Sequence, residues 1–141
     1  MPDADPTLAL ALLRAADWFD DALRARLSRD GVRLTRSQAQ VFAALDPGGS
    51  SIAALARAVG VTRQSMHRTV GELVDLGLLD VGTDPDDARA SLVRLTRVGA
   101  ALVRRAAREL REVEAELARR IGARRVAALR DALAADWGPA P

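Results

Sequence analysis

The chain of 141 residues has the length of one globular domain, and its 49% hydrophobic and 28% charged residues are typical of a folded chain. It contains no cysteine and one histidine, which excludes disulfide scaffolds, cysteine nucleophiles and multi-histidine metal sites. No apolar run approaches the ~18 residues of a membrane span, and the N-terminal segment is acidic where a secretory signal is basic. We therefore expect a cytoplasmic protein without a metal, a cofactor or a membrane partner.

The net charge is only +2, so the distribution of charge is more informative than the total. All 21 basic residues are arginine. Residues 1–30 carry four arginines and six aspartates, while residues 96–141 carry ten arginines and six acids. Residues 51–71 carry three arginines and no acid, in a chain that has 19 acids. This acid-free segment is the first candidate for a surface that binds an anionic partner.

The first predicted element is a helix over residues 7–29. Two adjacent apolar stripes run along it at helical spacing, namely Leu12, Ala16, Phe19, Leu23 and Leu27, and Ala11, Ala15, Trp18, Ala22 and Ala25. Together they cover about half of the helix surface, which is more than the ~100° stripe of an ordinary surface helix. Such a helix packs against more than one neighbour. It is either the central helix of a monomer or a helix shared between its own domain and a second subunit.

Capping residues then predict three short helices. Thr35, Ser51 and Thr62 are suitable N-caps for helices through residue 45, over residues 52–59 and to about residue 76. Residues 46–50 form a turn rich in glycine. Gly60 and Gly77 stand where the second and third of these helices end.

The hydrophobic period changes after residue 77. Residues 78–81 and 91–95 are predicted strands of a β-hairpin, and the polar residues 82–88 form its long tip. Thr96 caps a long helix to residue 121, Gly122 interrupts it, and a last helix covers residues 123–135. The predicted fold class is therefore mainly α, with a small β component.

The helices over 52–59 and 62–76 are joined through the segment Ala58-Val59-Gly60-Val61, in the pattern of a helix-turn-helix, and the hairpin that follows makes this a winged helix. On a helical wheel Met66, Val70 and Leu73 define the core face of the second helix. Gln64, Arg68 and Gly71 point directly away from that core face, and His67 lies at its flank. Arg63 lies in the first turn beside the N-cap. Glutamine pairs with adenine and arginine with guanine in the major groove, and a helix N-terminus with a threonine hydroxyl holds a phosphate. This surface therefore predicts binding to double-stranded DNA.

Three segments resemble the MarR family of bacterial transcriptional regulators: LTRSQAQVFAAL, then SIAALARAVGVTRQSMHRTVGELVDLGLL, then DPDDARASLVRLTRVGAAL. The resemblance covers residues 34–102, and its most specific part is the wing pattern D-P-D-D-x-R-x-x-x-V-x-L-T-x-x-G that ends at Gly99. It implies one domain over residues 1–141, a winged helix-turn-helix with long terminal helices. Residues 35–95 would bind DNA, while residues 7–29 and 96–136 would form a homodimer.

The resemblance also implies roles for individual residues. The recognition-helix contacts to DNA would be Thr62, Arg63, Gln64, Ser65, His67 and Arg68. Arg89 would be the wing-tip arginine that enters the minor groove, and Asp87 would pair with it and aim it. A pocket between the dimerisation and DNA-binding parts would take a small apolar or aromatic effector, with Trp18 and Phe19 as candidate lining residues. The expected function is that of a ligand-responsive repressor that binds a pseudo-palindromic operator.

The wing departs from the family pattern, because Val81, Gly82 and Ala88 stand where many members carry basic residues. The alternative function is therefore a winged-helix ligand-sensing or protein-binding module with little DNA affinity. An enzyme is not expected, because His67 has no nucleophile or acid pair placed beside it by a motif. The acids at 84, 86 and 87 lack the spacing of a calcium loop and are interpreted as turn formers.

Overall fold

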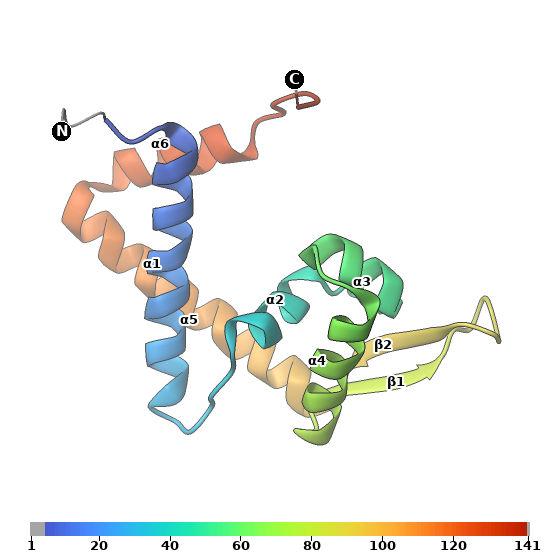
Figure 1. Ribbon diagram of the computed structural model, residues 1–141. Helices are drawn as coiled ribbons and strands as arrows, with labels where there is room; N and C mark the ends of the chain where they lie inside the picture. The colour runs from blue at the N-terminus through green and yellow to red at the C-terminus, as the bar shows by residue number, and fades with distance from the viewer. Residues whose placement is uncertain (1–4, 141) are drawn as a thin grey trace. The chain divides into compact units, whose positions relative to one another are not determined.

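The computed structural model describes residues 5–140, in which helices predominate over one small antiparallel sheet (Figure 1). The elements are α1 (Leu8–Ser28), α2 (Arg36–Ala44), α3 (Ile52–Val59), α4 (Arg63–Asp75), β1 (Leu79–Thr83), β2 (Ser91–Leu95), α5 (Arg97–Ile121) and α6 (Ala123–Ala134). They form two compact units: Gly31–Arg105 holds α2 to β2 and the start of α5, and the second unit holds α1, the rest of α5 and α6. The order of elements confirms the predicted winged helix-turn-helix fold class.

The helices begin where their capping residues predict. The hydroxyl of Thr35 accepts from the backbone N–H of Gln38 at 3.2 Å, and Ser51 and Thr62 cap α3 and α4 in the same way. Each cap satisfies an N–H group that the first turn of a helix leaves unpaired. Gly60 ends α3 in the left-handed conformation with φ of +78°, which favours glycine, and so permits the tight turn into α4.

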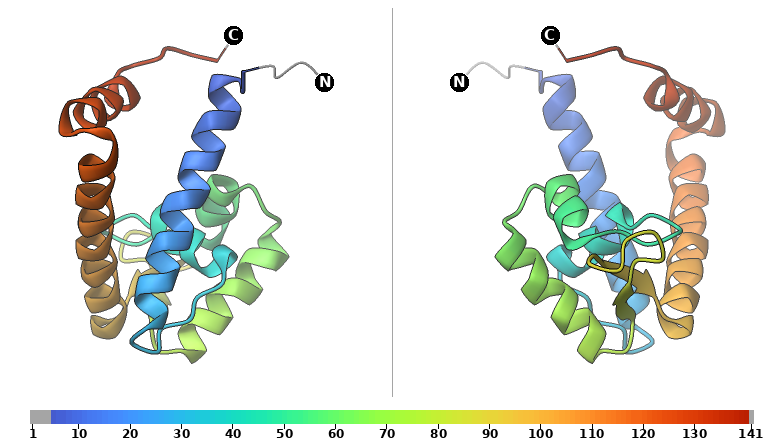
Figure 2. Two further views of the ribbon diagram at one scale, coloured as in Figure 1. Left: turned by 90° about the vertical axis from the view of Figure 1, so that its left-hand side faces the viewer. Right: turned by 90° about the vertical axis from the view of Figure 1, so that its right-hand side faces the viewer.

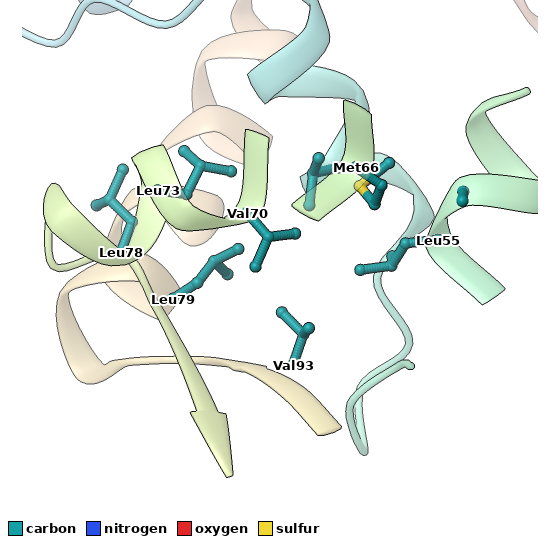
Figure 3. Packing of buried hydrophobic residues seen from close by; sticks show 9 residues of the cluster. Leu55, Met66, Val70, Leu73, Leu78, Leu79 and Val93 are labelled. Carbon is teal, nitrogen blue, oxygen red and sulfur yellow. The ribbon is translucent and has the colours of Figure 1, made fainter. Parts of the chain in front are cut away.

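The core of the winged-helix unit is built from apolar residues of α2, α3, α4 and the hairpin (Figure 3). Met66, Val70 and Leu73 of α4 are buried, as the helical wheel predicts, against Leu55 of α3 and Val93 of β2. These α4 side chains use one face of the helix only. The opposite face is therefore left on the surface of the unit.

The hairpin is longer than predicted. β1 and β2 pair antiparallel from Leu79 opposite Leu95 to Thr83 opposite Ser91, so the ladder continues through residues 82 and 83, which we expected in the loop. A further bridge joins Ser50 to Val93 by two backbone hydrogen bonds of 3.0 and 2.8 Å. The turn before α3 thus adds one strand-like residue to the other side of β2.

A threonine joins the hairpin to the long helix that follows it. The Thr96 hydroxyl donates to the carbonyl of Gly77 at 2.6 Å and accepts from the N–H of Gly99 at 3.0 Å, while its backbone N–H bonds to the carbonyl of Leu78. Thr96 therefore caps α5, as predicted, and fixes its first turn to the end of α4.

Ion pairs join α1 to α5 in the second unit. Arg26 of α1 contacts Glu109 at 3.2 Å and Glu116 at 3.5 Å, both on α5. Figure 2 shows α5 as a long continuous helix, with α6 turning away at its C-terminal end, where Gly122 has φ of +102°. Of the two apolar stripes predicted on α1, only Leu27 is buried in the single chain. Much of the apolar surface of α1 is therefore exposed.

Residues 5–140 contain neither a candidate membrane span nor a candidate metal-binding cluster. No helix in that range combines the length and the apolar composition that a membrane crossing requires. The same residues contain no group of three histidine, cysteine, aspartate or glutamate side chains placed to hold a metal ion.

Candidate nucleic-acid interface

The exposed face of α4 carries four polar side chains without internal partners. Arg63, Gln64, His67 and Arg68 are all exposed, and none of their side chains forms a hydrogen bond or an ion pair within residues 5–140. Their donors and acceptors are therefore available to a partner. The sequence predicted this orientation from the buried positions of the same helix.

The start of α4 offers backbone donors as well. Thr62 is exposed, and its hydroxyl oxygen accepts from the N–H of Ser65 at 3.1 Å, which leaves its own proton free to donate. The first-turn N–H groups and the helix dipole favour an anion at this end. Ser65 is only half-exposed, and its carbonyl accepts from the hydroxyl of Thr69 at 3.1 Å. Of the predicted contacts on α4, Ser65 is the least accessible.

A polar contact that the sequence analysis missed holds α4 against α2. The Nε2 of Gln38, a side chain only 8% exposed, donates to the Oε2 of Glu72 at 3.0 Å, and its Oε1 accepts from the N–H of Thr35 at 3.0 Å. The threonine and the glutamine three residues later form a capping box, a pattern that is visible in the sequence. The pairing with Glu72 spans 34 positions and leaves no local signal.

The wing tip is a set of nested turns built by aspartates. The carboxylate of Asp84 accepts from the N–H of Asp86 at 2.9 Å, and that of Asp87 accepts from the N–H of Arg89 at 3.0 Å. The acids are thus turn formers, as predicted. The expected pairing of Asp87 with the guanidinium of Arg89 is not formed within the described residues, where the Asp87 carboxylate accepts from the Arg89 backbone N–H instead. Arg89 is exposed, and within the described residues its guanidinium has no ion-pair partner.

The two aromatic candidates for effector binding are neighbours on α1. Trp18 is 37% exposed and Phe19 is half-buried, and their rings meet edge to face with centroids 5.1 Å apart. A separate shallow cavity of about 300 Å³ lies between α5 and α6, lined mainly by alanines, Val126, Arg111 and Arg130. Neither aromatic residue lines that cavity.

A helix-turn-helix with an exposed, unpartnered polar face and a following hairpin defines the class of winged-helix DNA-binding proteins. The family model described as MarR family matches residues 34–90. An HTH-type transcriptional regulator of Mycobacterium bovis is 34% identical over 116 residues, which are 82% of this chain and 80% of the relative. The chain belongs to the MarR family, whose members regulate transcription by binding DNA and small-molecule ligands and are not enzymes.

Solved structures of the family share the fold. The MarR family protein Rv2887 of Mycobacterium tuberculosis, solved in complex with salicylic acid, is 28% identical, with a TM-score of 0.68 over 94% of this chain and 97% of that one. Wild-type MarR of E. coli in its apo form is 21% identical, with a TM-score of 0.75 over 92% of this chain and 96% of that one. The similarity therefore extends over both terminal helices as well as the winged helix.

Proposed function

We propose that this MarR-family regulator is a ligand-responsive repressor, which binds a pseudo-palindromic operator as a homodimer in the cytoplasm, where the bacterial chromosome lies. The observation that carries the proposal is the face of α4, where Arg63, Gln64, His67 and Arg68 are exposed and have no internal partner. A polar face with this many unused donors, on the second helix of a helix-turn-helix, suits the major groove.

Each contact has a distinct chemical role in this proposal. Arg68 reads guanine through N7 and O6, and Gln64 reads adenine, because both side chains form two parallel hydrogen bonds with those bases. Thr62, Ser65 and the first N–H groups of α4 hold a phosphate, and Arg63 and His67 bind the backbone beside it. Arg89 of the wing enters the minor groove, with Asp87 shaping the turn that presents it.

Homodimer formation is supported by the exposed apolar side chains of the terminal helices. Leu8 is 69% exposed and Leu13 is 65% exposed on α1, and Leu133 is 48% exposed on α6. The charges of the two terminal segments are complementary, since residues 1–30 carry four arginines and six acids and residues 96–141 carry ten arginines and six acids. A two-fold dimer sets two recognition helices about one DNA turn, ~34 Å, apart.

A small aromatic or apolar effector is supported by the edge-to-face pair of Trp18 and Phe19, and by the salicylic acid bound to Rv2887. Such a ligand stacks on aromatic rings. The chain has two tryptophans, so the variant Trp137→Phe leaves Trp18 as the sole fluorescent reporter. Compounds that release DNA are expected to change the fluorescence of that variant, and a releasing compound that leaves it unchanged binds elsewhere.

The experiment that tests the proposal is selection from a random library of DNA duplexes by the purified protein, followed by footprinting of the enriched sequence. We expect a two-fold symmetric motif with A·T-rich flanks. The second candidate function, a ligand sensor with little DNA affinity, is favoured by the acidic wing tip, where Asp84, Asp86 and Asp87 accompany only one arginine. Failure to enrich any sequence would support that second candidate.

A further inference from the structure

A hydrogen bond between α2 and α4 engages the acid that stands closest to Arg68 along the recognition helix. Gln38 Nε2 donates to Glu72 Oε2 at 3.0 Å, and both residues belong to the unit Gly31–Arg105. Gln38 is 8% exposed, so this polar side chain lies within the packed interior of the unit rather than on its surface. Buried polar groups are hydrogen-bonded, and here both ends of the amide have partners.

The capping box at the start of α2 fixes the direction in which Gln38 donates. Its Oε1 accepts from the N–H of Thr35 at 3.0 Å, while its own backbone N–H bonds to the Thr35 hydroxyl at 3.2 Å. The amide oxygen and nitrogen stand on the same planar group, so a fixed position for the oxygen also fixes where the nitrogen points. The Nε2 donors are therefore aimed across the helix interface at Glu72.

Glu72 lies four residues after Arg68, a spacing at which opposite charges on a helix attract each other. In this structure the two side chains are not paired. Glu72 bonds to Gln38, whereas the Arg68 guanidinium is exposed and has no hydrogen-bond or ion-pair partner within residues 5–140. Because residues 51–71 contain no acid, Glu72 is the acid nearest to Arg68 along the chain.

We propose that Gln38 is a positioning residue for DNA recognition, which holds the Glu72 carboxylate and thereby leaves the Arg68 guanidinium available to DNA. The inference rests on the proposed function, in which Arg68 contacts a base. When position 38 lacks a donor, Glu72 turns to Arg68, and the DNA must then displace that carboxylate in both half-sites of the operator.

A double-mutant cycle tests this coupling. Gln38→Met keeps the length of the side chain and removes the donor, and it is made both in the wild type and in a Glu72→Gln background. The amide introduced by Glu72→Gln still accepts from Gln38 but has no charge to attract Arg68. Affinity is measured by fluorescence anisotropy on a labelled duplex that the wild-type protein has enriched from a random library.

We expect Gln38→Met to weaken binding about two- to fivefold in the wild-type background, since one competing ion pair must be broken in each half-site. In the Glu72→Gln background the same substitution should leave the affinity unchanged. A purely structural role for Gln38 predicts an equal loss in both backgrounds, because the hydrogen bond is lost in both. An equal loss, or no loss in the wild-type background, would overturn the proposal.

If Gln38→Met does not fold, Gln38→Glu takes its place in the cycle at alkaline pH. That variant preserves the acceptor for Thr35 and the capping box, and it turns a carboxylate toward Glu72 in place of a donor. Arg68→Ala is measured on the same duplex. If Arg68→Ala binds as tightly as the wild type, the proposed base contact itself is wrong. If Arg68→Ala loses affinity and the cycle shows no coupling, only the role of Gln38 is refuted.

Discussion

A Cβ atom on Gly99 would lie 2.0 Å from the carbonyl oxygen of Leu78, well inside any permitted non-bonded contact. Hydrogen bonds hold the two segments at this short distance. The Leu78 carbonyl accepts from the N–H of Thr96 at 3.1 Å, and the Thr96 hydroxyl accepts from the N–H of Gly99. The glycine that ends the wing motif is thus required by the close packing of the first turn of α5 on the segment between α4 and β1.

Replacement of that glycine should destabilise the fold. We expect Gly99→Ala to lower the free energy of unfolding by about 2 kcal/mol or more, since backbone must move to admit the methyl group. The matched control is Gly71→Ala on α4, where a Cβ meets nothing within 4 Å. The control should be neutral or stabilising by up to ~1 kcal/mol, because alanine favours a helix. Urea unfolding at one protein concentration measures both, and wild-type stability of Gly99→Ala would contradict the steric argument.

Arg68→Ala should relax base preference. We expect a loss of about 1–3 kcal/mol in binding to the enriched duplex, with reduced discrimination at one base-pair position in each half-site. Arg57→Ala is the control, because Arg57 is an exposed arginine of α3 in the same acid-free segment. Titrations against duplexes with single base-pair changes distinguish the two. A variant that retains both the affinity and the base preference of the wild type would show that the recognition-helix assignment is wrong.

Arg89→Ala should reduce the salt dependence of binding. Each dimer loses two cationic contacts, so the slope of log K against log salt should fall by up to about two, near 0.9 per contact. The preference for A·T-rich flanks should weaken as well, because a narrow minor groove attracts an inserted arginine. Arg94→Ala, on β2 of the same hairpin, is the control. An unchanged slope and affinity would mean that the wing does not touch DNA, in favour of a sensor that binds DNA weakly.

Light scattering should give about twice the chain mass of 15.0 kDa at low micromolar concentration. Leu13→Glu places a charge among the exposed apolar side chains of α1 and should shift the protein toward the monomer, since a buried unpaired charge is costly. Leu76→Glu is the control at a leucine of similar exposure, 56% against 65%, outside the terminal helices. A monomeric wild type, or equal effects of the two substitutions, would refute dimerisation through α1.

Stability should depend on the charge of Glu116. A hydrogen bond from Arg120, and then the charge of that arginine, hold the pKa of the Glu116 carboxyl below its ordinary value, and Arg26 adds to this effect. Because the pKa is lower in the folded protein, the ionised carboxylate stabilises the fold above the unfolded-state pKa, and this contribution is lost as pH falls through the folded-state pKa.

Glu116→Gln should therefore lower the melting temperature at neutral pH, and the difference from the wild type should narrow on acidification. Glu112→Gln, at an exposed position of the same helix, serves as the matched control. Thermal melts of the three proteins across the acidic range measure the effect. A difference that stays constant with pH would mean that the carboxylate charge of Glu116 does not contribute.

Local chemistry was predictable from the sequence where a single residue determines it. Helices are capped at the predicted positions by Thr35, Ser51, Thr62 and Thr96. A hydroxyl just before a run of apolar residues at helical spacing can accept from an unpaired N–H of the first turn, so the sequence indicates the cap. The buried face of α4 followed from helical spacing, and the exposed face followed as its complement. The residues that we propose to contact DNA on that face were thus predicted from helical spacing as well as from the family resemblance.

Contacts between distant segments were not predictable in the same way. Ser50 pairs with Val93 through a single bridge, and one residue cannot show the alternation of apolar and polar side chains that marks a strand. Gly82 and Thr83 belong to β1 because they pair with Leu92 and Ser91 on β2. The pairing of Gln38 with Glu72 arises only when α2 packs on α4. The Asp87 carboxylate accepts from the backbone N–H of Arg89, because the tight turn places that N–H close to it.

The hairpin also has two unequal edges. Ser50 covers β2 at Val93, while β1 pairs along one side only among the described residues. An open strand edge invites pairing with another chain, and proteins resist this with short strands and charged side chains at the edge. β1 has five residues and exposes Asp80 near its middle. Sheet-to-sheet association of two wings is therefore disfavoured, and the hairpin projects as a single arm.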